Sequence, residues 1–123
     1  HYYRAKAYLD AGKTDGAMED LKVLAKDTRN VYGAEAKYKV AQIYFDGGQT
    51  DKAEQEVLNY IEVSTPHTYW LARSFVLLAD VYMKLGRNLD AKQYLLSLKQ
   101  NYQADDDIAG MIESRLEKLK TEN

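Results

Sequence analysis

Cysteine is absent from the 123 residues, and its absence removes three kinds of chemistry at once. The chain can form no disulfide, no zinc site with thiolate ligands and no covalent intermediate at a cysteine nucleophile. A chain without thiols is compatible with the cytoplasm and with an oxidising compartment alike. The cysteine count therefore leaves the compartment open.

Long apolar runs and runs of one charge are also missing. No stretch approaches the roughly 18 consecutive apolar residues that a membrane-spanning helix needs, so we expect a soluble segment without direct membrane insertion. The 17 Lys and Arg residues and the 19 Asp and Glu residues are mixed along the chain and leave a formal net charge of −2. Because no basic stretch could follow a phosphate backbone, nucleic acid is not an expected partner.

The residue patterns of known catalytic and cofactor sites do not occur either. Histidine is present twice, as His1 and His67, and neither has an acidic or nucleophilic partner at a recognisable spacing. The serines stand outside any Gly-x-Ser-x-Gly motif, and the chain has no glycine-rich phosphate loop and no dinucleotide fingerprint. We therefore predict a protein that is not an enzyme and that uses no cofactor and no metal.

The sequence does contain an internal repeat. The pattern Ala-x-x-Tyr-x-x-x-Gly-x-x-x-x-Ala occurs three times, and its copies begin at Ala5, Ala41 and Ala79, which are 36 and 38 residues apart. Such periods are typical of helical solenoids, in which each repeat buries its apolar face against its neighbours. The remaining pattern residues are Tyr8, Gly12, Ala17; Tyr44, Gly48, Ala53; and Tyr82, Gly86, Ala91. The chain therefore predicts an all-helical repeat fold.

Each position of the pattern has a physical role. The glycine predicts a tight turn between paired helices, because it adopts positive φ without steric cost. Thr14, Thr50 and Asn88 follow the turns and are expected to cap the second helix of each pair. The apolar residues of that helix recur on one face, as Ala17, Leu21, Leu24; Ala53, Val57, Tyr60; and Ala91, Leu95, Leu98. The pattern tyrosines are expected to pack beside the small alanines in the core.

A last helix is predicted from about residue 105 to 121. Its apolar residues at helical spacing are Ile108, Met111, Ile112, Leu116 and Leu119. The triplet Asp105–Asp107 before them raises the alternative of a calcium site. Consecutive carboxylates cannot all point at one ion, however, and no glycine-containing ligand loop with a distal Glu follows. We interpret the triplet as the start of a helix that caps the solenoid.

The repeated pattern resembles the tetratricopeptide repeat, whose signature has a small residue, an aromatic residue three later, a turn glycine and an alanine five beyond it. The resemblance implies a right-handed superhelix of three helix-turn-helix repeats, at about residues 1–30, 31–65 and 66–103, followed by the capping helix. We expect residues 1–123 to form a single domain and to be a piece of a longer protein.

Two features depart from that signature. Arg4 stands where the family usually has an apolar residue, as Val40 and Leu78 are in the other copies. The family's proline between repeats is matched only by Pro66, which we expect at the first position of a helix that continues to Leu85. The first repeat is therefore the least typical of the three.

A looser likeness concerns the setting in which the protein works. The long repeat spacing and the segment from Glu35 to Phe45 are similar to bacterial envelope members of the family. This likeness favours the bacterial periplasm or cell envelope over the cytoplasm. The chain begins without the apolar segment of a signal peptide, and a mature exported domain would look the same.

The resemblance also implies where a partner would bind, because the first helix of each pair lines the concave face in this family. The corresponding residues are Tyr2, Lys6, Leu9, Tyr38, Gln42, Phe45, Arg73, Val76, Asp80 and Met83. Their aromatic and flexible apolar side chains could anchor a peptide. The family's clamp for a C-terminal carboxylate is not expected, because its positions hold Tyr2, Lys6, Lys39, Arg73 and Leu77.

Two functional hypotheses follow. The first is a non-catalytic scaffold that binds a peptide or partner domain, of unknown identity, through this concave face. The second is a structural or regulatory appendage that positions a neighbouring domain of a larger enzyme or of a secretion or assembly machine. In the second hypothesis the groove is filled by other parts of the same protein or by flanking repeats.

Overall fold

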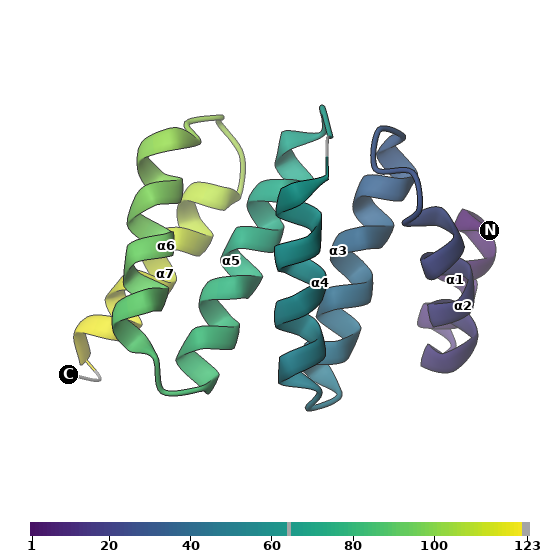
Figure 1. Cartoon of the computed structure of the whole chain (residues 1–123), viewed down its shortest axis with the longest axis horizontal. Coiled ribbons are helices and arrows are strands. Elements are labelled where there is room, and N and C mark those ends of the chain that lie inside the picture. Colours follow the sequence, from purple (N-terminus) through teal and green to yellow (C-terminus); the bar gives the residue numbers. More distant parts are fainter. Residues whose placement is uncertain (64, 122–123) are drawn as a thin grey trace. The chain divides into compact units, whose positions relative to one another are not determined.

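The computed structural model describes residues 1–63 and 65–121, which form seven α-helices and no strand (Figure 1). The helices are α1 Tyr2–Asp10, α2 Thr14–Leu24, α3 Val31–Asp46, α4 Thr50–Glu62, α5 Thr68–Lys84, α6 Asn88–Asn101 and α7 Ile108–Thr121. They gather into two compact units, His1–Leu71 and Ala72–Asn123, which we call unit 1 and unit 2. The predicted all-helical class, with paired helices and a C-terminal helix, is confirmed.

In unit 1, α1 packs on α2, α2 on α3 and α3 on α4. Small residues at the helix crossings let the backbones approach, since Ala5, Ala17 and Ala36 are almost fully buried. Leu21 and Val40 fill the space between them, and burial of such side chains contributes about 1.5–3 kcal/mol each. The predicted stripe of α4 is also buried, because Ala53, Val57 and Tyr60 have at most 1% of their surface exposed. This core positions the surface described below.

The turns between paired helices follow one design. Gly12, Gly48 and Gly86 have φ values of 74°, 81° and 77°, as the repeat pattern predicts. In each turn the N–H of the residue after the glycine donates to the carbonyl of the pattern tyrosine, closing a Schellman motif. These bonds are Lys13 to Tyr8 at 2.7 Å, Gln49 to Tyr44 at 2.8 Å and Arg87 to Tyr82 at 2.7 Å. The pattern tyrosine therefore marks the last turn of the first helix.

The predicted side-chain caps at Thr14, Thr50 and Asn88 are wrong. These residues are the first of their helices, and the N-cap positions belong to Lys13, Gln49 and Arg87, which make no side-chain cap hydrogen bond. The Schellman turn explains the difference, because a single residue serves as the end of one turn and as the N-cap of the next helix. Asp15, Asp51 and Asp90 do lie in the first turns, where they favour the positive end of the helix.

A close backbone approach joins α2 to α3. A Cβ atom placed on Gly33, in the first turn of α3, would lie 1.8 Å from the carbonyl oxygen of Asp27 and 2.7 Å from that of Leu24. Only glycine fits there. Asn30 caps α3, and its side chain accepts the N–H of Tyr32 at 2.8 Å. The repeat pattern gives no signal for either residue.

The segment before α5 is held against the loop between α2 and α3. The hydroxyl of Thr65 donates to the carbonyl of Thr28 at 2.7 Å and accepts the N–H of His67 at 3.1 Å. Because the chain turns here, Pro66 does not open a helix, and the expectation that it holds the first helical position is wrong. Helix α5 begins at Thr68 and ends at Lys84. Ser64 lies outside the described residues.

Unit 2 contains α6, α7 and most of α5. The ring of Tyr94 on α6 lies 5.5 Å from that of Tyr82 and 6.2 Å from that of Phe75, both on α5. Helix α7 packs on α6, and Ile108, Ile112 and Leu119 of its predicted stripe are buried.

The start of α7 follows the capping interpretation. Asp106 accepts the N–H of Ile108, the first residue of the helix, at 2.9 Å, and the hydroxyl of Tyr102 donates to the same carboxylate at 2.6 Å. A carboxylate at this end of a helix satisfies a free N–H and suits the positive end of the helix dipole. Asp106 of the acidic triplet therefore acts through hydrogen bonds to the chain itself.

Candidate functional site

The ten residues predicted to line a concave face have different environments. Lys6 is exposed, and seven others are partly buried, namely Tyr2, Leu9, Gln42, Phe45, Arg73, Asp80 and Met83. Tyr38 and Val76 have only 5% and 3% of their surface exposed. The expectation that these two side chains are open to a partner is wrong. The ring of Tyr38 instead packs 5.7 Å from that of Trp70, within unit 1.

Tyr2 belongs to an aromatic cluster at the start of unit 1. Its ring lies 4.5 Å from the ring of Tyr32, and its hydroxyl donates to Glu35 at 3.3 Å. Burial and the neighbouring Glu35 carboxylate raise the pKa of the Tyr2 phenol, so the hydroxyl keeps its proton and remains a donor. The Lys6 ammonium lies 5.5 Å from the centre of the same ring. The two predicted site residues, Tyr2 and Lys6, therefore contact each other and other residues of the same chain.

In unit 2, one predicted site residue is held by the C-terminal helix. The guanidinium of Arg115 on α7 donates to both oxygens of Asp80 on α5, at 2.7 and 3.0 Å. Bidentate pairs of this kind fix two helices in register as well as neutralise charge. The position that the resemblance gives to a partner is therefore occupied by α7.

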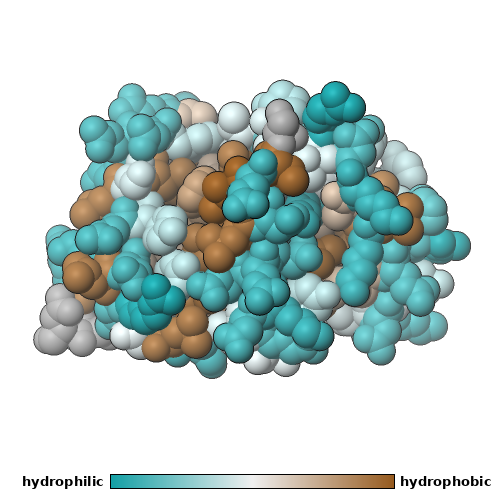
Figure 2. Space-filling model, viewed as in Figure 1, coloured by the Kyte–Doolittle hydropathy of each residue, from teal (hydrophilic) through white to brown (hydrophobic). Residues whose placement is uncertain are grey.

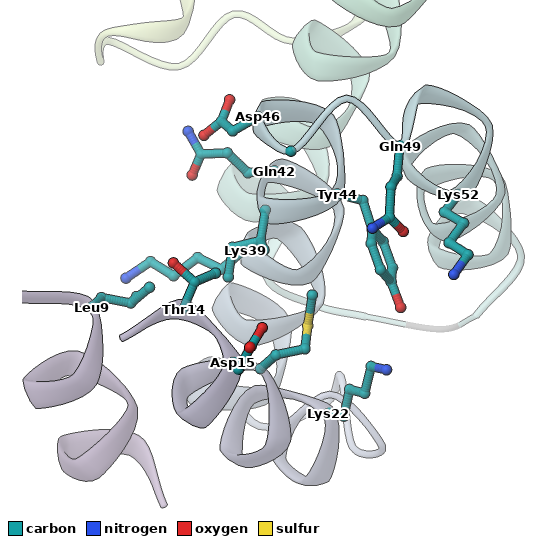
Figure 3. A pocket seen from close by; sticks show the side chains of 13 residues that line it. Leu9, Thr14, Asp15, Lys22, Lys39, Gln42, Tyr44, Asp46, Gln49 and Lys52 are labelled. Atoms are coloured by element: carbon teal, nitrogen blue, oxygen red, sulfur yellow. The ribbon is translucent and has the colours of Figure 1, made fainter. Parts of the chain in front are cut away.

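Unit 1 carries an open groove of about 740 Å³ beside α3 (Figure 3). Its lining residues are Leu9, Thr14, Asp15, Met18, Lys22, Lys39, Gln42, Ile43, Tyr44, Asp46, Gly47, Gln49 and Lys52. They come from α1, from α2, from α3 and the turn after it, and from the start of α4. Of the predicted site residues, the structure brings Leu9 and Gln42 together here.

The groove has an apolar floor and a polar rim. Leu9, Met18 and Ile43 are partly buried and pack against the core of Ala5, Ala17, Leu21, Ala36 and Val40. Gln42, Asp46 and Gln49 are polar lining residues, and Figure 3 shows Gln42 beside Asp46 and Gln49 near Tyr44. An apolar base with a few polar groups around it is the usual composition of a recognition site.

Tyr44 forms one wall of the groove. The sequence places it in the core with Tyr8 and Tyr82, but only Tyr82 is buried, with 4% exposed, and Tyr8 and Tyr44 are partly exposed. The ammonium groups of Lys22 on α2 and Lys52 on α4 lie 5.8 and 5.7 Å from the centre of the Tyr44 ring. Tyr44 and Lys22 also line a second hollow of about 440 Å³ between α2 and α4.

Sequence reasoning missed Lys22 and Lys52. No repeat-related spacing connects them, because the residue equivalent to Lys22 in the second copy is Leu58 and the residue equivalent to Lys52 in the first copy is Gly16. They meet only because Tyr44 projects between two second helices. Lys22 and Lys52 therefore come together only when the two repeats pack against each other.

Asp20 is the one charged residue among the buried polar residues of the described ranges, with 2% exposed. Arg4 donates to both of its oxygens, at 2.6 and 2.8 Å, and the imidazole Nδ1 of His1 lies 3.0 Å from it. The hydrogen bonds from Arg4 lower the pKa of the Asp20 carboxyl, although burial opposes this. The departure of Arg4 from the repeat signature is thereby explained, because its partner is a buried carboxylate.

The described residues contain no group of three His, Cys, Asp or Glu side chains that could hold a metal ion. None of the helices in residues 1–63 and 65–121 combines the length and the apolar character that crossing a membrane requires. Figure 2 shows a face that is mainly hydrophilic, with hydrophobic residues visible in patches.

Comparison with known families supports the repeat assignment. Two models of the tetratricopeptide repeat match the chain, one over residues 1–27 and one over residues 72–102. The first match covers α1 and α2, and the second covers α6 and α5 from Ala72 onward. Each unit therefore contains a segment similar to the tetratricopeptide repeat. Repeats of this family generally mediate protein–protein interaction and typically belong to non-catalytic scaffolds.

The comparisons with curated proteins and with solved structures found no match. The likeness to bacterial envelope members of the family stays a prediction.

Proposed function

We propose that the chain is a non-catalytic protein-interaction scaffold whose unit 1 groove holds a segment of a partner polypeptide. The observation that carries this proposal is the groove itself, an open apolar floor between two helix pairs with polar side chains around it. Its volume of about 740 Å³ is within the roughly 300–1,000 Å³ of clefts that bury a ligand. Apolar side chains of a bound segment would leave water and pack on the floor, and this burial would stabilise the complex.

The polar side chains of the rim give the groove selectivity for its ligand, which the apolar floor does not provide. Apolar burial is non-directional, whereas amide and carboxylate groups accept only partners that complete their hydrogen bonds. Gln42 and Gln49 line the groove, and Asp46 lies beside Gln42. The groove is therefore suited to recognising a particular peptide segment.

Crosslinking of the full-length protein in its native cells, followed by purification and mass spectrometry, tests the proposal. The double substitution Gln42→Arg and Gln49→Arg places bulk and charge on the rim. The matched control, Gln55→Arg and Gln93→Arg, changes two exposed glutamines outside the groove. We expect partners captured by the wild type and the control to be lost from the rim variant. Equal capture by all three would reject the groove as the binding surface.

One observation favours the second hypothesis, an appendage that positions a neighbouring domain. Asp80, a predicted site residue, is paired with Arg115 of α7 and so is occupied by the same chain. In this alternative the rim variant captures the same partners as the wild type. Its effect would instead be a change in the crosslinks between this segment and the rest of the full-length protein.

A further inference from the structure

The Tyr44 end of the unit 1 groove has the chemistry of a carboxylate site. The side chains of Lys22 and Lys52 come from different helices and place their ammonium groups 5.8 and 5.7 Å from the centre of the Tyr44 ring. Figure 3 shows the ring between the two lysines. Both distances are within the range at which a cation is attracted to a ring face. Two positive charges thus lie beside the same aromatic ring.

These charges are not neutralised within the chain. None of the ion pairs in the part of the chain that the structure describes involves Lys22, Lys52 or the nearby Lys26. Two other lysines of the same surface behave differently, because Lys37 pairs with Glu56 at 3.1 Å and Lys39 with Glu35 at 2.6 Å. Neighbouring cations without counterions create a positive potential that an anion between them would lower.

We infer that this end of the groove binds a carboxylate side chain, so that the partner segment is an acidic peptide. The inference rests on the proposed function and names the chemistry of the partner. A Glu or Asp of the segment would accept hydrogen bonds from Lys22, Lys52 and the Tyr44 hydroxyl. An adjacent apolar side chain would lie on the floor of Met18 and Ile43.

The rest of the groove favours an acidic peptide over a nucleic acid. Asp15 and Asp46 line the same groove, and their charges would repel the regularly spaced phosphates of a strand. A peptide can place its carboxylates at the lysine end alone. The site is also separate from the positions of the family's carboxylate clamp, since Lys22, Tyr44 and Lys52 are not among them.

The test is a titration of the uniformly ¹⁵N-labelled chain, followed by heteronuclear NMR. The probe is a short, end-blocked peptide of alternating Glu and Leu, and its counterpart has Gln in place of every Glu. We expect the Glu peptide to shift the amide signals of Lys22, Tyr44 and Lys52. The Gln peptide should bind at least about tenfold more weakly, because its amides make no charge-assisted hydrogen bonds. Equal affinity, or no shift with the Glu peptide, would overturn the inference.

Paired variants assign the effect to the two lysines. Lys22→Gln with Lys52→Gln should weaken binding of the Glu peptide by about tenfold or more. Lys92→Gln with Lys118→Gln removes the same charge from exposed lysines of unit 2 and should leave the affinity unchanged. An equal loss in both variants would mean that net charge, and not this site, governs binding, and would also overturn the inference.

The outcomes separate this inference from the proposed function. If the Gln peptide shifts Gln42 and Ile43 as strongly as the Glu peptide does, the groove holds a peptide and the acidic specificity is rejected. If an oligouridine RNA binds more tightly than the Glu peptide and depends on the same lysines, nucleic acid replaces the acidic peptide. The rim variant with Gln42→Arg and Gln49→Arg tests the scaffold itself, whatever the titration gives.

Discussion

At the scale of single residues, two tyrosines of α3 have opposite environments. Tyr38 is 5% exposed and packs against Trp70. Tyr44 is partly exposed and stands between the Lys22 and Lys52 ammonium groups. The first side chain serves stability, whereas the second forms part of a surface. The repeat pattern predicts burial for Tyr44, because its spacing shows which side of the helix meets a neighbour and not how completely the neighbour covers it.

Alanine substitution of these tyrosines should separate the two roles. We expect Tyr38→Ala to lower the free energy of unfolding by about 3–5 kcal/mol, as large aromatic truncations in a core do. Tyr44→Ala should cost less than about 2 kcal/mol, because its side chain is only partly buried. Urea unfolding followed by circular dichroism measures both. A larger loss for Tyr44→Ala would contradict the assignment of Tyr44 to the groove wall.

The pair of the exposed Arg4 and the buried Asp20 predicts a dependence of stability on pH. Arg4 lowers the folded-state pKa of Asp20 below its unfolded value, so the pair stabilises the fold fully above the unfolded pKa of about 3.9. That stabilisation is lost as the pH falls through the folded pKa. Asp20→Asn should therefore be less stable than the wild type at neutral pH, and the difference should narrow below about pH 4.

Urea unfolding at a series of pH values measures that difference. Asp10→Asn, which changes an exposed carboxylate at the end of α1, is the control and should alter the free energy of unfolding by within about 0.5 kcal/mol at neutral pH. A difference between wild type and Asp20→Asn that stays constant into acid would show that the pair does not shift the titration of Asp20.

At the scale of helices, the sequence predicts which elements form but not every detail of their ends. The turn glycines and the buried stripes follow from local spacing, and the structure confirms them. The caps of α2, α4 and α6 could not be predicted in this way, because a Schellman turn uses the N-cap residue to close the preceding helix. The close approach at Gly33 depends on a loop outside the repeat signature.

Asn30, which caps a helix, and Thr50, which does not, test the assignment of the N-caps. Asn30→Ala removes a side chain that accepts the N–H of Tyr32 and should cost about 1 kcal/mol. Thr50→Ala removes no cap hydrogen bond and should change the free energy of unfolding by within about 0.5 kcal/mol. Thermal unfolding of the two variants under identical conditions compares them. The reverse order would restore Thr50 as a cap.

The crossing of α2 and α3 predicts a strong effect at one glycine. Gly33→Ala places a methyl group against the carbonyl of Asp27, so the helices must move apart, at a cost of at least about 1–3 kcal/mol. Gly110→Ala, in α7, meets no atom within 4 Å and should be neutral or stabilising by up to about 1 kcal/mol. Urea unfolding measures both, and similar effects at the two sites would contradict the described packing.

At the scale of the whole molecule, segments similar to tetratricopeptide repeats support a protein-binding role, and we propose the unit 1 groove as the surface for it. Leu9 and Gln42 could be predicted as surface residues, because the resemblance assigns the first helix of each pair to the binding face. Lys22 and Lys52 could not, because they meet at Tyr44 only after two repeats pack together. Likewise, the sequence does not show that Tyr38 packs against Trp70, which is far along the chain.

The most direct measurement places a photo-crosslinking amino acid, benzoylphenylalanine, at Gln42 in the full-length protein and, separately, at Gln93 on the exposed surface of α6. Irradiation of native cells, followed by mass spectrometry, identifies what each position touches. We expect crosslinks to a partner polypeptide from Gln42 and none to that partner from Gln93. Crosslinks from Gln93 alone, or equally from both positions, would contradict the groove as the surface on which the protein binds its partner.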